Sequence, residues 1–119
     1  MTTTFHADEL EPADLQDKPL GPPTAVAEGE VLARSRTFFT SDDGNIQVGT
    51  WECEPGVFRW EFLERGEAIH VLSGSMTVQR DGYQPVKITA GTSAIFPLGW
   101  CGRWTVHDTL RKVYVIYRR

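Results

Sequence analysis

The chain has 119 residues, of which 40% are hydrophobic and 24% charged, and its formal net charge at pH 7 is −4. These values are ordinary for one globular domain that forms its own hydrophobic core without disulfides or metals. The acidic balance argues against nucleic acid and acidic lipid as partners, and no apolar run approaches the roughly 18 residues of a membrane span.

The first residues contain neither a basic segment nor an apolar segment of the kind that begins a secretory signal. We therefore expect a cytoplasmic protein. Its two cysteines, Cys53 and Cys101, do not match the spacing of a metal site, and we expect them to be reduced and partly buried thiols.

Residues 1–30 differ in character from the rest. They contain four prolines interspersed with acidic residues and show no apolar periodicity. This pattern predicts an extended arm, with polyproline II structure at Pro22-Pro23 and at most one short helical turn in each of 7–10 and 12–15. The arm either hangs free or lies over the domain or a partner subunit. The single folded domain is expected to span 31–119.

From Val31 onward, short apolar segments alternate with turn residues, and no helical period is visible. The spacing predicts about nine antiparallel strands and an all-β sandwich or barrel. The clearest strand segments are 46–53, 57–63, 67–72, 75–80, 86–89, 93–96, 102–107 and 111–117.

Two of these segments, 68–72 and 113–117, are apolar on both faces. One face of an antiparallel sheet is often exposed to water, so two apolar faces indicate that part of the outer surface is covered. The N-terminal arm or a second subunit could provide the cover. We expect a homodimer.

Two segments that end in glycine carry a family resemblance. Glu67 is followed after six residues by Gly74, and Gly91 after five residues by Pro97-x-Gly99. This spacing is similar to that of the two motifs of the cupin superfamily. Further phrases resemble the small single-domain cupins related to the cupin domain of (S)-ureidoglycine aminohydrolase: DGNIQVGTWECEPG, HVLSGSMTV, GTSAIFPLGWCGRWTV and RKVYVIY. The resemblance implies a jelly-roll β-barrel of two facing sheets, with the motif residues at its mouth and room for one small ligand.

Metal-binding cupins carry two histidines before the motif acid, and a histidine and an asparagine after the second motif. Counted back from Glu67, the two histidine positions hold Trp60 and Phe62, or Glu61 and Leu63 under the shorter spacing. Counted from the second motif, the histidine and asparagine positions hold Gly102 and Val106. Only Glu67 remains of the ligand set. A transition metal requires three or four N, O or S ligands, so we expect no bound metal and no cofactor.

Strand parity places Glu67 on one face with Ile69 and Val71, so the acid begins an inward apolar face. It is either a semi-buried acid that caps loop amides or pairs with a base, or it is a general acid/base or the anchor of a ligand. The three histidines, at 6, 70 and 107, do not cluster, and parity turns His70 and His107 away from the inner face.

Lys112 shares parity with Tyr114 and Ile116. It is either a solvated lysine at a sheet edge, which is the commoner position, or a partner of Glu67 suited to proton transfer. The predicted catalytic residues are Glu67 and Lys112. The aromatic residues could belong to the hydrophobic core or to the wall of a pocket. The predicted ligand-binding residues are Trp60, Phe62, Trp100, Arg103, Trp104 and Tyr114.

Three functional hypotheses follow. The first is a metal-free cupin that binds a small polar metabolite, such as a ureide, an amino acid or a sugar, and performs acid/base chemistry through Glu67. The second is a non-catalytic binder or sensor in which Trp60 and Trp104 stack on the ligand. The third is a structural dimer whose pocket is filled by its own aromatic residues. Whether the protein is an enzyme stays open, since fold alone does not decide function.

Overall fold

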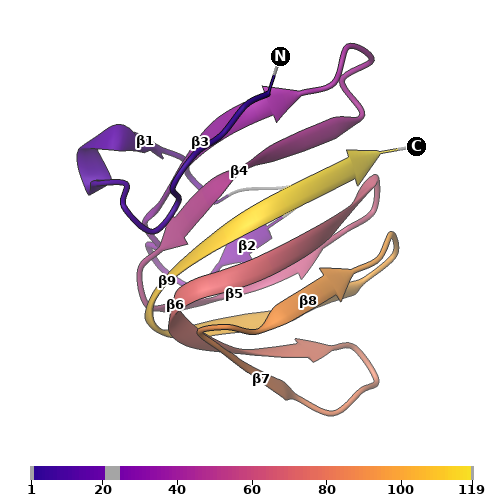
Figure 1. The fold of residues 1–119 in the computed structure, drawn as a ribbon. Helices are drawn as coiled ribbons and strands as arrows, with labels where there is room; N and C mark the ends of the chain where they lie inside the picture. Colours follow the sequence, from indigo (N-terminus) through magenta and orange to yellow (C-terminus); the bar gives the residue numbers. More distant parts are fainter. Residues whose placement is uncertain (1, 21–24, 119) are drawn as a thin grey trace.

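The structure is a computed structural model that describes residues 2–20 and 25–118. The polyproline II expectation at Pro22-Pro23 lies outside the described residues. Figure 1 shows a strongly curled antiparallel sheet. The described elements are the short 3-10 helix η1 (Pro12–Asp14) and the strands β1 (Gln16–Asp17), β2 (Ala25–Ala27), β3 (Ala33–Thr40), β4 (Ile46–Cys53), β5 (Gly56–Glu61), β6 (Arg65–Arg80), β7 (Val86–Thr89), β8 (Ser93–Phe96) and β9 (Cys101–Arg118). The all-β prediction is confirmed.

The sheet folds into two layers because its two longest strands, β6 and β9, run through both of them (Figure 1). In the first layer, β4 and the first part of β6 flank residues 110–118 of β9, with β3 beyond β4 and β8 beyond β6. In the second layer, β5 and the last part of β6 flank residues 101–106 of β9, with β2 beyond β5 and β7 beyond β6. This is the two-layer jelly roll that the cupin resemblance implies.

The sequence predicted each of these long strands as two shorter ones. Ser73-Gly74 was expected to be a break, whereas the register between β6 and β9 shifts there and pairing resumes at Ser75. Gly74 has a φ of 86°, and a Cβ atom on it would lie 2.1 Å from the carbonyl oxygen of Thr109. Only glycine combines this backbone conformation with so close an approach. The glycine therefore bends the strand from one layer into the other.

The core lies between the layers and is dominated by aromatic side chains. Trp60 and Trp104 stack with centroids 5.0 Å apart, and Phe62 and Phe96 stack at 5.5 Å. Every second residue of β5 and of the first part of β9 points inward, which brings Trp60 and Trp104 together. Phe62 follows directly after β5, and Phe96 is the last residue of β8. Burial of such large rings is the main stabilising contribution of a small core.

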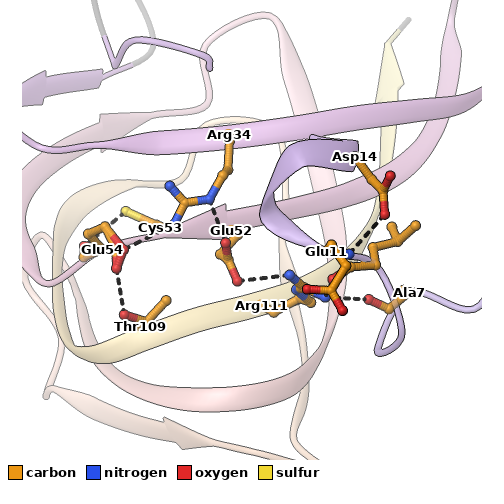
Figure 2. Close-up of polar contacts among 10 residues, drawn as sticks. Ala7, Glu11, Asp14, Arg34, Glu52, Cys53, Glu54, Thr109 and Arg111 are labelled. Carbon is orange, nitrogen blue, oxygen red and sulfur yellow. Dashed lines mark hydrogen bonds and ion pairs between the residues drawn. The ribbon is translucent and has the colours of Figure 1, made fainter. Parts of the chain in front are cut away.

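The N-terminal arm lies against its own domain. The strand β1 pairs with β3 at the edge of the first layer, and β2 pairs with β5 at the edge of the second. Before them, the arm crosses the outer face of the first layer. There the guanidinium of Arg111 donates to the carbonyl oxygen of Ala7 at 3.1 Å, to that of Leu10, and to Glu52 at 3.0 Å (Figure 2). Arg34 donates to the other oxygen of Glu52 and continues the network.

An apolar row of side chains crosses the rest of this outer face and is partly exposed. Strand pairing places Ile95, Ala68, Val115, Val48 and Phe39 side by side across β8, β6, β9, β4 and β3. Ile95 is 70% exposed, Phe39 48% and Val115 37%. The arm thus covers one part of the face and leaves this row accessible. In the part of the chain that the structure describes, none of the helical segments has the length and apolar character needed to cross a membrane.

Candidate functional site

Glu67 and Lys112 form an ion pair inside the barrel. The Nζ atom of Lys112 lies 2.6 Å from Oε2 of Glu67, and the two side chains are 2% and 3% exposed. Lys112 is not at a sheet edge, because its strand lies between β4 and β6, where it pairs with Trp51 and Val71. The commoner position considered for this lysine is therefore wrong, and the alternative, a partner of Glu67, is observed.

Indole rings surround the ammonium group of Lys112. Its Nζ lies 4.3 Å from the ring centroid of Trp51 and 4.7 Å from that of Trp104, within the range of cation–π attraction. Burial lowers the pKa of Lys112, and the charge of Glu67 and its hydrogen bond act in the opposite direction. The lysine is thus a desolvated amine held by one carboxylate and two aromatic faces.

A small cavity of about 30 Å³ opens beside this pair. Three of the side chains that line it are basic and one is acidic, although the whole chain has a net charge of −4. A wider surface hollow of about 670 Å³, bordered by the arm and β3, shares Lys18 and Ser35 with the cavity. The cavity is lined by Lys18, Ser35, Trp51, Trp60, Arg65, Glu67, Lys112, Tyr114 and Ile116.

The basic residues at the mouth repel one another. Burial and the nearby charge of Arg65 lower the pKa of Lys18. Burial also lowers the pKa of Arg65, with Glu67 opposing the shift and Arg118 adding to it. The Arg65 guanidinium lies 5.9 Å from the ring centroid of Trp60. The three basic side chains that line the cavity thus face a single acidic one, which leaves an excess of positive charge.

The structure brings part of the predicted ligand-binding set to this cavity. Trp60 and Tyr114 line it, and the Tyr114 hydroxyl is held 3.1 Å from Oγ1 of Thr37. Phe62, Trp100 and Trp104 belong to the aromatic core and are not among the cavity-lining residues. The ring of Trp104 nevertheless lies within cation–π distance of the ammonium of Lys112.

The structure does not bring Arg103 to the cavity. Its side chain is 62% exposed and pairs with Glu28 at 3.2 Å. The reason is strand parity: Arg103 lies between Gly102 and the inward-facing Trp104, so it points outward. Its proximity to the motif in sequence was a misleading signal.

Sequence reasoning missed five lining residues: Lys18, Ser35, Trp51, Arg65 and Ile116. Arg65 was assigned to a turn, but β6 begins at Arg65 and gives it the same parity as Glu67. Alternation in the segment 46–53 could likewise have placed Trp51 inside. Ser35 pairs with Trp51, and Lys18 follows β1 in the arm. Nothing local in the sequence indicates that the arm returns to the mouth.

The residues present do not fit the metal site of metal-binding cupins. At Gly102, one of the positions where those proteins have histidine, a Cβ atom would lie 2.2 Å from the carbonyl oxygen of Gln79. The acid that would bind the metal is already bonded to an ammonium group, which would repel a cation. Among the described residues no group of three or more His, Cys, Asp or Glu side chains is arranged to hold an ion.

Both cysteines are free thiols in the structure. Cys53 is buried and Cys101 partly buried. Burial raises the pKa of the Cys53 thiol to about 12, so this group is unreactive at neutral pH.

Comparison with known proteins agrees with this architecture. The EutQ-like cupin domain family matches residues 40–114. Among solved structures, the Clostridium difficile EutQ protein is 24% identical, with a TM-score of 0.65 over 76% of this chain and 71% of its own. A putative ethanolamine utilization protein Q from Salmonella typhimurium LT2 has the same identity and TM-score, over 77% of this chain and 73% of its own.

A DUF861 family protein from Thermotoga maritima is 31% identical over 55% of this chain and 73% of its own, with a TM-score of 0.52. The comparison with curated proteins found no match. The family match covers more than half of the chain, and the curled two-layer sheet described above agrees with it. The chain belongs to the family of EutQ-like cupin domains.

Proposed function

We propose that this cupin binds a small polar metabolite at the mouth of its barrel and exchanges a proton with it through Glu67 and Lys112. The observation that supports this most is the buried pair itself, 2.6 Å between charged atoms, at the side of a cavity lined by charged and aromatic side chains. A group that enters the cavity meets a carboxylate able to accept a proton. It also meets an ammonium able to donate one or to stabilise developing negative charge.

Stability alone is a weak reason for such a pair. Removing two charges from water is costly, and apolar residues of similar size often serve the fold equally well or better. The pair and the basic mouth together favour a role in ligand chemistry. The (S)-ureidoglycine aminohydrolase reaction is not proposed, because in that family it depends on a metal and this chain keeps only the acid of the ligand set.

A thermal-shift screen against small polar metabolites tests the proposal, since a ligand that binds only the folded state must raise the melting temperature. We expect at least one compound to stabilise the protein and Ser35→Ala to weaken that effect, because Ser35 lines the cavity without touching the ion pair. Arg80→Gln, on the far surface against Tyr83, is the control. If no compound stabilises the wild type, the proposal is wrong and the barrel is a filled scaffold.

Each compound that stabilises the protein is then tested for turnover, which distinguishes a catalyst from a protein that only binds the compound. Product should form with the wild type and not with Glu67→Gln, and circular dichroism must show that the variant is folded. If bound ligand is unchanged in both proteins, the protein is a binder or sensor.

We further propose that the protein is a homodimer, joined through the apolar row of Ile95, Ala68, Val115, Val48 and Phe39. The arm shields only the neighbouring part of that sheet face, and contiguous exposed apolar surface is typical of an interaction site. Sedimentation at micromolar concentration should give a dimer for the wild type and a monomer for Val115→Glu. A monomeric wild type would refute the dimer proposal.

We also propose that the protein is cytoplasmic, because its two free thiols suit that reducing compartment.

A further inference from the structure

Two buried hydrogen-bond donors at the cavity lack acceptors. The Nε atom of Arg65 and the Nε1 atom of Trp60 are inaccessible to solvent and have no partner among the described residues. Both side chains line the cavity. A buried donor without an acceptor costs roughly 1–3 kcal/mol, so a ligand that supplies acceptors gains this energy on binding.

The charge around the cavity has a definite sign. Lys18, Arg65 and Lys112 line it, and the single carboxylate, Glu67, is bonded to Lys112. No salt bridge involves Lys18 or Arg65 among the described residues. Two cations are therefore left for a ligand to neutralise, in a place where partial burial strengthens electrostatic attraction.

We propose that the cavity binds the carboxylate group of a small organic acid, held by Arg65 and Trp60 with the ammonium of Lys18 closing the mouth. This inference deepens the proposed function and rests on it. A carboxylate carries only acceptors and matches a guanidinium in shape and charge. The remainder of the acid extends into the wider hollow that shares Lys18 and Ser35.

Other ligand groups fit less well. A cavity of about 30 Å³ is tight for a tetrahedral phosphate but admits one planar group of a few atoms. A cationic group meets three positive side chains. A neutral amide carries no charge to neutralise Arg65 and Lys18, and it brings N–H donors to a cavity whose unpartnered groups are themselves donors. Charge, size and hydrogen bonding thus agree on a carboxylate.

In this arrangement the bound carboxylate fixes the orientation of the acid. The atoms next to it then lie near Glu67 and Lys112, the pair to which the proposed function assigns proton exchange. Arg65 and Lys18 act as binding residues that touch the substrate, and their loss weakens binding without changing the proton-transfer groups.

The test uses the full chain and four small probes: acetate, acetamide, methylammonium and inorganic phosphate. Binding is followed by the indole N–H resonances in ¹H–¹⁵N NMR spectra, because the Trp60 donor gains an acceptor. We expect acetate to shift the Trp60 resonance, and Arg65→Gln and Lys18→Gln each to weaken acetate binding about tenfold or more. Arg80→Gln, an arginine that packs on Tyr83 away from the cavity, should leave acetate binding unchanged.

Two results would overturn the inference while leaving the proposed function intact. One is equal or tighter binding of acetamide, methylammonium or phosphate. The other is acetate binding that survives both substitutions. If none of the four probes shifts the indole resonance, and the metabolite screen also finds no ligand, the proposed function fails together with the inference. A metabolite that binds while acetate does not would overturn the carboxylate assignment alone.

Discussion

The Nζ atom of Lys112 lies 2.6 Å from a carboxylate oxygen of Glu67, the one acid that this chain keeps from the ligand set of metal-binding cupins. The chain provides its own cation here, on the neighbouring strand of the same layer. Because the indoles of Trp51 and Trp104 cover this cation, it is removed from water and pairs with a single acid. The interior site is therefore an acid–amine pair in an aromatic setting.

A double-mutant cycle tests how strongly the two charges depend on each other. Glu67→Leu or Lys112→Met alone leaves one buried group without its partner, and each should lower the free energy of unfolding by about 3–5 kcal/mol. The double variant Glu67→Leu/Lys112→Met removes both charges and should be close to the wild type. Urea unfolding measures all of these. Additive losses would show that the pair is not coupled.

Removal of Arg111 should release the arm. Its guanidinium connects the carbonyl oxygens of Ala7 and Leu10 to Glu52, and these contacts are buried or nearly so (Figure 2). We expect Arg111→Ala to destabilise the fold by about 2–3 kcal/mol and to expose residues 5–15 to hydrogen exchange and proteases. Arg103→Ala, which breaks only an exposed pair with Glu28, should cost about 1 kcal/mol or less. Equal effects of the two substitutions would contradict this account of the arm.

The Cys53 thiol should make stability fall at high pH. Burial raises its pKa from the ordinary 9.0 to about 12, so between these values the native state holds a proton that the unfolded chain has lost. The folded state then binds more protons, and the free energy of unfolding decreases as pH rises from 9 to 12, by at most about 1.4 kcal/mol per pH unit. Lys112, whose pKa burial lowers, acts with the opposite sign.

Comparison with Cys53→Ala isolates the contribution of this thiol. The variant should be less stable at pH 7, because a cavity replaces the sulfur, but its stability should decline less steeply above pH 9. Denaturant unfolding at several pH values provides the two curves. Parallel curves would show that Cys53 ionises equally in both states.

Gly102 should not accept a side chain. A Cβ atom at this position would lie 2.2 Å from the Gln79 carbonyl oxygen and 2.8 Å from the Trp100 ring, and backbone cannot yield as a flexible side chain does. We expect Gly102→Ala to lower stability by about 3 kcal/mol, and Gly102→His to gain no affinity for Mn²⁺ or Zn²⁺ in calorimetry. Gly82→Asn, at an open left-handed turn where asparagine is tolerated, should cost less than about 1 kcal/mol. A stable, metal-binding Gly102→His protein would contradict this.

The sequence determined the fold and the place of the central acid. Alternation and turn chemistry placed the strands at 46–53, 86–89 and 93–96 with the bounds that the structure has, because these signals depend on neighbouring residues only. Parity in the strand that contains Glu67 correctly turned that acid inward and His70 outward. The spacing of the two motifs, Glu67 to Gly74 and Gly91 to Gly99, indicated a cupin, which the family match confirms.

Only the tertiary structure decided what Glu67 faces. From the sequence, Lys112 could lie at a sheet edge or inside the barrel. The strand order decides between the two, because β9 lies between β4 and β6. Lys18 reaches the mouth because the arm pairs with β3, and Arg65 does so because β6 begins earlier than its turn-like residues indicated. These are contacts between residues distant in the chain, which depend on strand order and layer closure. Local periodicity carries no information about them, and so the positive lining of the cavity around Glu67 was visible only in three dimensions.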